Sequence, residues 1–193
     1  MLTSSDIRIH RATATEAEAI ARVHVRAWRA AYRGILPQPY LDGLDVASRA
    51  GSWGREMSTL PEERRPWVAI VDGRILGFCV AGPARDEDLG ARCAEVYAIY
   101  VDPECWAIGV GRALLDHQLA FLRRRGHAEA CLWVLAANTR AIGFYEHGRW
   151  AADGRRRSIT IGGQEVEEVR YRVRLRAAGG RPGEAASARL ASR

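Results

Sequence analysis

Two glycines at the start of a predicted helix are the residues in this sequence that most directly suggest chemistry. An apolar stretch at residues 96–101 ends at Asp102-Pro103, and Gly109-Val110-Gly111 then leads into a helical pattern. The first amide groups of a helix have no partners within it, and the helix dipole adds partial positive charge beside them. Glycine lets an anion approach such a backbone, so the spacing predicts a phosphate or pyrophosphate site. The residues expected to form it are Ala107, Ile108, Gly109, Val110, Gly111 and Arg112.

The two glycines are open to other interpretations. A tight turn without a ligand fits the pattern equally well. A dinucleotide-binding turn is disfavoured, because Leu114 stands where Gly-x-Gly-x-x-Gly needs its third glycine. A P-loop is excluded, because that motif requires a lysine and every basic residue of this chain is an arginine.

The segment Trp106-Ala107-Ile108-Gly109-Val110-Gly111 resembles the acetyl-CoA motif of the GNAT superfamily of acyl-CoA N-acyltransferases, Gln/Arg-x-x-Gly-x-Gly/Ala. Both glycines match, whereas Trp106 replaces the Gln or Arg, and Ile108 stands where a basic residue is common. Residues 25–37, 132–146 and 168–172 are similar to other segments of this family. The resemblance implies an enzyme that transfers the acetyl group of acetyl-CoA to a primary amine by direct attack in a ternary complex.

The resemblance also implies roles for residues around the cofactor. Tyr145 is the expected general acid that protonates the departing CoA thiolate; a core tyrosine is the alternative. Asn138 is expected to cap a short helix, as its residue type favours, and by resemblance to contact the pantetheine arm. The backbone of Ile99, Tyr100 and Val101 is expected to bind the acetyl group and the pantetheine amide as a sheet edge.

On the acceptor side, the resemblance implies that Glu95 receives the amine proton, since many family members carry a carboxylate at this point of the central strand. A solvated glutamate at a strand end is the alternative. Strict alternation along the strand places Glu95, Tyr97 and Ile99 on one face.

Three residues of the first predicted helix, His24, Trp28 and Tyr32, share one face at a spacing of four. They form either an aromatic wall for the acceptor, which is a small-molecule or peptide amine, or part of the core. The sequence does not identify the acceptor.

A mixed α+β fold must position these residues. The expected order is strand, two helices, three strands, helix, strand, helix and two strands, around a single mixed, mostly antiparallel central sheet flanked by helices. The first helix is expected to begin at a capping box formed by Thr15 and Glu18. One GNAT-like domain is predicted at residues 6–176, and the composition of residues 177–193 predicts a disordered tail.

The composition leaves two other classes of function open. The formal net charge is +6, which suits an anionic cofactor or, less well, nucleic acid, because no dense basic stripe with aromatic residues is present. A non-catalytic acyl-CoA sensor of the same fold is the other alternative, although the presence of Tyr145 favours an enzyme. A homodimer is left open.

The sequence also leads to expectations about the location of the protein, its contact with membranes and its metal content. No apolar run is long enough to span a bilayer, and the first ten residues do not resemble a signal peptide, so a cytoplasmic protein without a membrane partner is predicted. The four cysteines are widely separated, so no metal site is expected.

Overall fold

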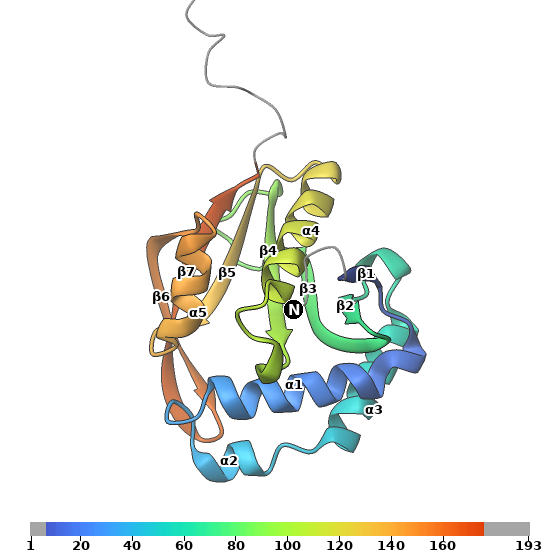
Figure 1. The fold of residues 1–193 in the computed structure, drawn as a ribbon. Helices are drawn as coiled ribbons and strands as arrows, with labels where there is room; N and C mark the ends of the chain where they lie inside the picture. Colours follow the sequence, from blue (N-terminus) through green and yellow to red (C-terminus); the bar gives the residue numbers. More distant parts are fainter. Residues whose placement is uncertain (1–6, 176–193) are drawn as a thin grey trace, which may run out of the picture.

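The computed structural model describes residues 7–175, and the predicted tail at 177–193 lies outside the described residues. The described chain forms a seven-stranded sheet with helices on both faces (Figure 1). Its strands are β1 (Arg8–Arg11), β2 (Trp67–Val71), β3 (Arg74–Pro83), β4 (Cys93–Val101), β5 (Glu129–Leu135), β6 (Ala151–Ile161) and β7 (Gln164–Arg174). Its helices are α1 (Ala17–Ala31), α2 (Gln38–Asp42), α3 (Val46–Thr59), α4 (Val110–Arg124) and α5 (Thr139–His147).

The sheet has the order β1-β2-β3-β4-β5-β7-β6, and its pairs are antiparallel except β4 with β5. The last two strands form a hairpin in which β7 pairs with β5, so β6 becomes an outer edge. This arrangement confirms the predicted mixed, mostly antiparallel sheet.

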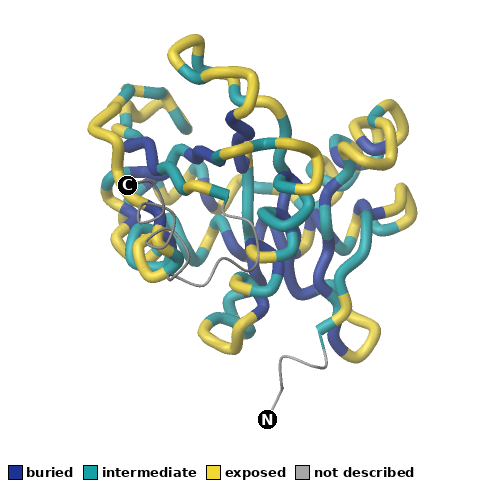
Figure 2. Tube along the Cα trace, turned by 90° about the horizontal axis from the view of Figure 1, so that it is seen from above, coloured by how far each residue is buried: buried dark blue, intermediate teal, exposed yellow. Residues whose placement is uncertain are grey.

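Alternation along the strands divides the apolar residues between the two faces of the sheet. On β2, Val68 packs with Ile20 of α1 and Trp53 of α3, while its neighbour Ala69 packs with Leu114 of α4 on the opposite face. The helices α1 and α3 therefore cover one face, and α4 and α5 cover the other (Figure 1). Figure 2 shows the buried residues concentrated along the central strands and the exposed ones in the connecting loops.

The predicted order of elements is confirmed, with two local differences. The short helix α2 was not predicted, because five residues are too few to show helical periodicity. The expected cap at Thr15 is also wrong. The backbone amide of Thr13 instead donates to Oε2 of Glu16 at 2.7 Å, and a 3₁₀ turn at Ala14–Glu16 precedes α1.

The β6–β7 hairpin lies against α2 and closes one end of the molecule. Gly162 has a φ of 59°, and a Cβ atom added to it would lie 2.5 Å from Cγ of Tyr40. A side chain at this position would push the hairpin away from α2. Ile159 and Ile161 of the hairpin pack with Leu41 of α2 in the same apolar cluster.

Within residues 7–175, no helix is both long and apolar enough to cross a membrane.

Candidate active site

A fork in the sheet creates a large cavity. The parallel strands β4 and β5 pair at three positions in the described chain, from Cys93 opposite Glu129 to Glu95 opposite Cys131. Beyond these positions the strands separate, and β5 continues its pairing with β7 alone. A cavity of about 870 Å³ is lined by residues of both strands where they separate and by residues of α1, α4, α5 and the β6–β7 hairpin.

Most residues predicted from the sequence as site residues line this one cavity. They are Trp28, Tyr32, Ile99, Tyr100, Val101, Ala107, Gly109, Gly111, Arg112, Asn138 and Tyr145. Four others are not among the lining residues: Glu95, His24, Ile108 and Val110. Residues 107–111, which contain both glycines, are called the glycine loop below. Val110 is buried in the core beneath this loop, and the side chain of Ile108 is exposed.

The glycine loop holds the start of α4 open toward the cavity. Ala107 and Gly109 both have left-handed backbone conformations, with φ angles of 65° and 93°, and Gly109 is the N-cap of the helix. A Cβ atom added to Gly111 would lie 3.4 Å from Cγ2 of Val101 and 3.6 Å from the ring of Phe144, so the first turn of α4 packs closely on β4 and α5. The unpaired amides of this turn and the helix dipole are together the features that favour binding of an anion.

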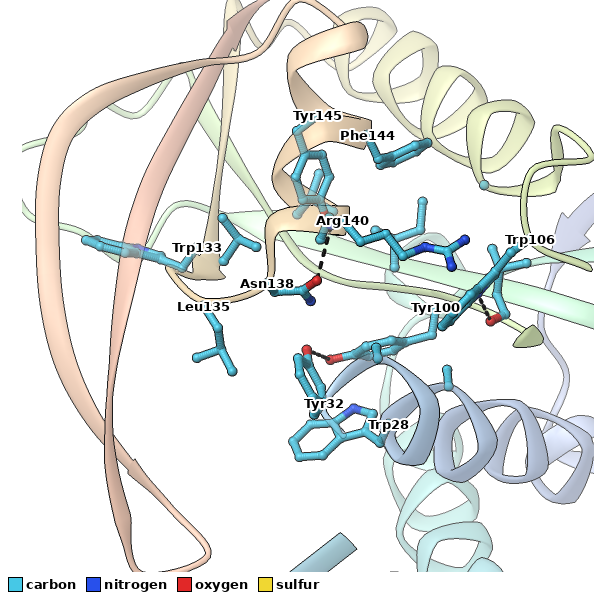
Figure 3. Close-up of a pocket in the computed structure, with 18 of the residues that line it drawn as sticks. Trp28, Tyr32, Tyr100, Trp106, Trp133, Leu135, Asn138, Arg140, Phe144 and Tyr145 are labelled. Atoms are coloured by element: carbon cyan, nitrogen blue, oxygen red, sulfur yellow. Dashed lines mark hydrogen bonds between the residues drawn. The ribbon is translucent and has the colours of Figure 1, made fainter. Parts of the chain in front are cut away.

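An arginine from another helix adds positive charge beside this loop. The guanidinium carbon of Arg140, in the first turn of α5, lies 3.4 Å from the ring centroid of Trp106. The indole Nε1 of Trp106 donates to the carbonyl oxygen of Val101 at 2.9 Å, which fixes the ring (Figure 3). No carboxylate within residues 7–175 is recorded as an ion-pair partner of Arg140.

Sequence reasoning missed Arg140, although a signal was present. A cation in the first turn of a helix is unfavourable with the helix dipole. Such a position is therefore expected to have a compensating partner. Trp106 gives a second indication. It stands in place of the Gln or Arg of the motif, and an aromatic ring at this position can stack against a guanidinium from elsewhere in the chain.

Asn138, at the start of α5, and Tyr145, within α5, both line the cavity. The side-chain Oδ1 of Asn138 accepts a hydrogen bond from the amide of Ala141 at 3.1 Å, which makes it the N-cap of α5. Tyr145 lies two turns further along this helix. Burial raises the pKa of the Tyr145 phenol well above its ordinary value, and the neighbouring Tyr100 phenol raises it further. The hydroxyl of Tyr145 therefore keeps its proton at neutral pH.

Glu95 lies at the base of the fork, where its carboxylate is held by Arg85. The amide and the Nε of Arg85 each donate to Oε2 at 3.1 Å, and a terminal nitrogen of the guanidinium contacts Oε1. Only 1% of the Glu95 side chain is exposed. Its carboxylate is thus engaged in a bidentate ion pair rather than turned to the cavity.

A bulge in β4 changes which face its residues occupy. Val80 and Ala81 of β3 lie opposite Ala98 and Val96, so Tyr97 has no residue opposite it. Tyr97 stays beside Glu95, since the guanidinium of Arg85 lies over its ring. Ile99 packs with the core on the side of α4, so the expectation that Ile99 shares a face with Glu95 and Tyr97 is wrong.

Aromatic residues at the C-terminal end of α1 and its cap form the wall opposite α5. Trp28 and Tyr32 meet edge to face with ring centroids 5.0 Å apart, and the hydroxyls of Tyr32 and Tyr100 lie 3.4 Å apart (Figure 3). His24 lies behind this wall, stacked on Tyr100 with centroids 5.0 Å apart. Burial lowers the pKa of His24 to about 3, and its Nδ1 accepts a hydrogen bond from Trp53. His24 is therefore neutral and supports the wall.

A buried arginine fastens the β3–β4 loop beside the cavity. Arg170 of β7 makes ion pairs with Asp86 and Asp88 of this loop and with Asp153 of β6, at 2.7 to 2.9 Å. The indole of Trp133, which lines the cavity, donates to Asp86 at 3.0 Å. The network holds the wall formed by β5 in place.

Comparison with known proteins agrees with this geometry. The sequence profile of the Acetyltransferase (GNAT) family matches residues 25–149. The chain belongs to this family, whose members are N-acetyltransferases, and the predicted class of enzyme is confirmed. Among the described residues, no group of three or more His, Cys, Asp or Glu side chains is arranged to hold a metal ion.

Particular relatives are similar over different shares of their length. The uncharacterized N-acetyltransferase YuaI of Bacillus subtilis is 32% identical over 84% of this chain and 90% of its own length. A mycothiol acetyltransferase of Saccharopolyspora erythraea is 33% identical over 72% of this chain, which spans 48% of that protein. The PaiA N-acetyltransferase of Thermoplasma acidophilum, solved with coenzyme A, shares the fold with a TM-score of 0.63 and 21% identity, over 84% of this chain and 97% of that structure.

Proposed function

We propose that this protein transfers the acetyl group of acetyl-CoA to a primary amine by direct attack within a ternary complex. The observation that carries the proposal is one cavity that joins the anion site at the start of α4, the open edge of β4 and the phenol of Tyr145. Acetyl-CoA carries its phosphates at one end and its thioester at the other. It therefore needs an anion site, a strand edge for the arm between its two ends, and a proton donor beside the sulfur, in this order.

The anionic part of acetyl-CoA binds at the glycine loop. The backbone amides of Gly109 to Arg112 hold the pyrophosphate, assisted by the side chains of Arg112 and Arg140. Arg112 also pairs with Asp116 at 2.9 Å, one turn along α4. Since this pair is on the surface, it stabilises the protein little and leaves Arg112 available to an anion.

The acyl end of acetyl-CoA lies along β4 in the fork. The backbone of Ile99, Tyr100 and Val101 is not paired with β5, so it binds the pantetheine amide and the thioester as an added strand would. Asn138 caps α5 at the same depth and contacts the pantetheine arm.

Tyr145 and a carboxylate supply the proton transfers. The Tyr145 hydroxyl donates a proton to the sulfur as the C–S bond breaks, which avoids the release of a free thiolate. Two carboxylates are candidates for receiving the proton of the amine. Glu95 is the one favoured by the sequence, and in the fold it acts through a water or after Arg85 releases it. Glu168 of β7 is the one that lines the cavity.

The test uses the purified full-length protein. With saturating acetyl-CoA at about 100 times its dissociation constant, linkage predicts about 2.7 kcal/mol of stabilisation and a clear rise in melting temperature. Thiol release that depends on both acetyl-CoA and an added amine would establish the transfer. If millimolar acetyl-CoA leaves the melting temperature unchanged and no amine elicits thiol release, the proposal fails.

A further inference from the structure

The acceptor end of the cavity differs in character from the cofactor end. At the glycine loop the charged lining residues are the cations Arg112 and Arg140. At the other end the walls are apolar, and they include Leu135, Ile159 and Ile161. Glu168 is the single carboxylate among the described residues that line the cavity.

Glu168 is held in place with one of its oxygens engaged. It lies opposite Arg157 in the β6–β7 hairpin, and Nε and a terminal nitrogen of Arg157 both contact Oε2 at 2.7 Å. The guanidinium of Arg157 is in turn stacked 4.2 Å from the ring centroid of Trp133. The Glu168 side chain is 13% exposed, so its position is fixed without being sealed in the core.

The charged and titratable groups around Glu168 come from several elements. Arg157 faces it from β6, Tyr32 from the C-cap of α1 and Tyr100 from β4. Burial raises the pKa of both phenols, and the negative charge of Glu168 raises it further. These two tyrosines are neutral at physiological pH, so Arg157 is the cation that shares the carboxylate.

We infer that Glu168, through Oε1, binds the ammonium group of the acceptor and accepts its proton, and that the acceptor is a compact primary monoamine with an aromatic or apolar body. This inference rests on the proposed acetyl transfer and extends it to the acceptor. The apolar body packs between the α1 wall of Trp28 and Tyr32 and the isoleucines of β6. A second ammonium, as in a polyamine, would be buried there without a partner, at considerable cost.

The proton balance of the reaction follows from these positions. The ammonium R–NH3⁺ gives one proton to Glu168 and becomes the neutral amine. Its nitrogen then forms a bond with the thioester carbon, and the C–S bond breaks with its electron pair on sulfur. Tyr145 donates a proton to sulfur and regains the proton that the nitrogen loses. Glu168 returns its proton to solvent, so the products are the amide, the free thiol and one proton.

The experiment compares Glu168→Gln with wild type on two amines of nearly the same shape. The first is 2-phenylethylamine, which is an ammonium ion at neutral pH. The second is 2,2-difluoro-2-phenylethylamine, whose fluorines make the nitrogen far less basic. We expect Glu168→Gln to lower kcat/KM for the first amine by about 10²–10⁴-fold, and for the second by far less. The defect with 2-phenylethylamine should shrink as the pH rises, because the free amine becomes more abundant.

A matched control lies next to Glu168 in the chain. Glu167 also pairs with an arginine of β6, with its Oε2 at 2.6 Å from Arg156, but this pair does not line the cavity. Glu167→Gln should retain wild-type kinetics with both amines. The melting temperature of each variant, with and without acetyl-CoA, reports its folding and cofactor binding separately from its activity.

Several outcomes would overturn the inference while the acetyl transfer stands. If Glu168→Gln acetylates 2-phenylethylamine with wild-type kinetics, Glu168 neither binds the ammonium group nor accepts its proton. An equal loss with both amines would make the role of Glu168 structural, and a defect with the same pH signature in Glu95→Gln alone would assign the base to Glu95. Efficient acetylation of spermidine but not of 2-phenylethylamine would refute the acceptor class. An absence of both acetyl-CoA binding and any transfer would instead contradict the proposed function itself.

Discussion

Replacing Arg140 with methionine tests how this chain binds the anionic part of its cofactor. Methionine keeps an unbranched, polarizable side chain over the ring of Trp106 and removes only the charge. A guanidinium about 4 Å from a phosphate at an effective dielectric of 20 interacts by about 4 kcal/mol. Desolvation offsets part of this energy, and hydrogen bonds to charged groups contribute about 1.5–3 kcal/mol net.

That range corresponds to a loss of affinity of about 10- to 150-fold, since 1.4 kcal/mol is a factor of ten. Arg140 is exposed in the free protein, so solvent screens its charge, and we expect a value in the lower part of this range.

Calorimetric titration with ligands of decreasing charge locates the interaction. The first ligand is acetyl-CoA, the second is its analogue without the 3′-phosphate, and the third is acetylpantetheine, which lacks the pyrophosphate together with the adenosine. Arg140→Met should weaken the first two ligands and leave acetylpantetheine unaffected. Arg124→Met is the control, because it removes the same charge from the opposite end of α4, about 20 Å from the glycine loop. Equal weakening of acetylpantetheine, or an unchanged affinity for acetyl-CoA, would refute the role of Arg140.

Three further perturbations address the acid, the loop and the buried histidine. Tyr145→Phe should lower kcat by about 10²–10⁴-fold in steady-state assays with little change in acetyl-CoA affinity, and an unchanged kcat would mean that the tyrosine is structural. Gly111→Glu should abolish the stabilisation by acetyl-CoA in thermal melts, whereas Gly111→Ala, whose Cβ would lie 3.4 Å from Val101, should retain it; the same loss in both would point to packing alone. His24 has a pKa of about 3, below the ordinary 6.5, so the unfolded chain takes up its proton first and stability falls as the pH drops through this window. In urea unfolding, His24 should make the free energy of unfolding about 2–3 kcal/mol lower at pH 4.5 than at pH 7. An equal pH dependence in His24→Gln would contradict this expectation.

Features set by neighbouring residues could be predicted from the sequence. Asp72-Gly73 marks the turn between β2 and β3, and both residues have positive φ angles, as a two-residue hairpin turn requires. Asn138 caps α5 as its residue type predicts. Both signals act within a few residues, where the chemistry of the backbone decides the structure.

Features that depend on distant contacts could not be predicted. The bulge at Tyr97 arises from the register between β3 and β4, which no single strand encodes. Glu168 reaches the cavity because β7 inserts between β5 and β6, an order that alternation along one strand does not reveal. Arg140 and Trp106 are separated by 33 intervening positions, so their residue types indicate that each needs a partner, but only the fold brings the two together.

The fork between β4 and β5 also bears on how the protein avoids self-association. Strands that separate within a sheet expose two inner edges, and an exposed edge is a template for pairing with a strand of another molecule. Here the inner edges are flanked by the aromatic residues of α1, by α5 and by the hairpin whose Gly162 packs on Tyr40. We expect these walls to hinder the approach of a strand from another molecule to either inner edge. The sheet can then be interrupted at this point without becoming a nucleation point for aggregation.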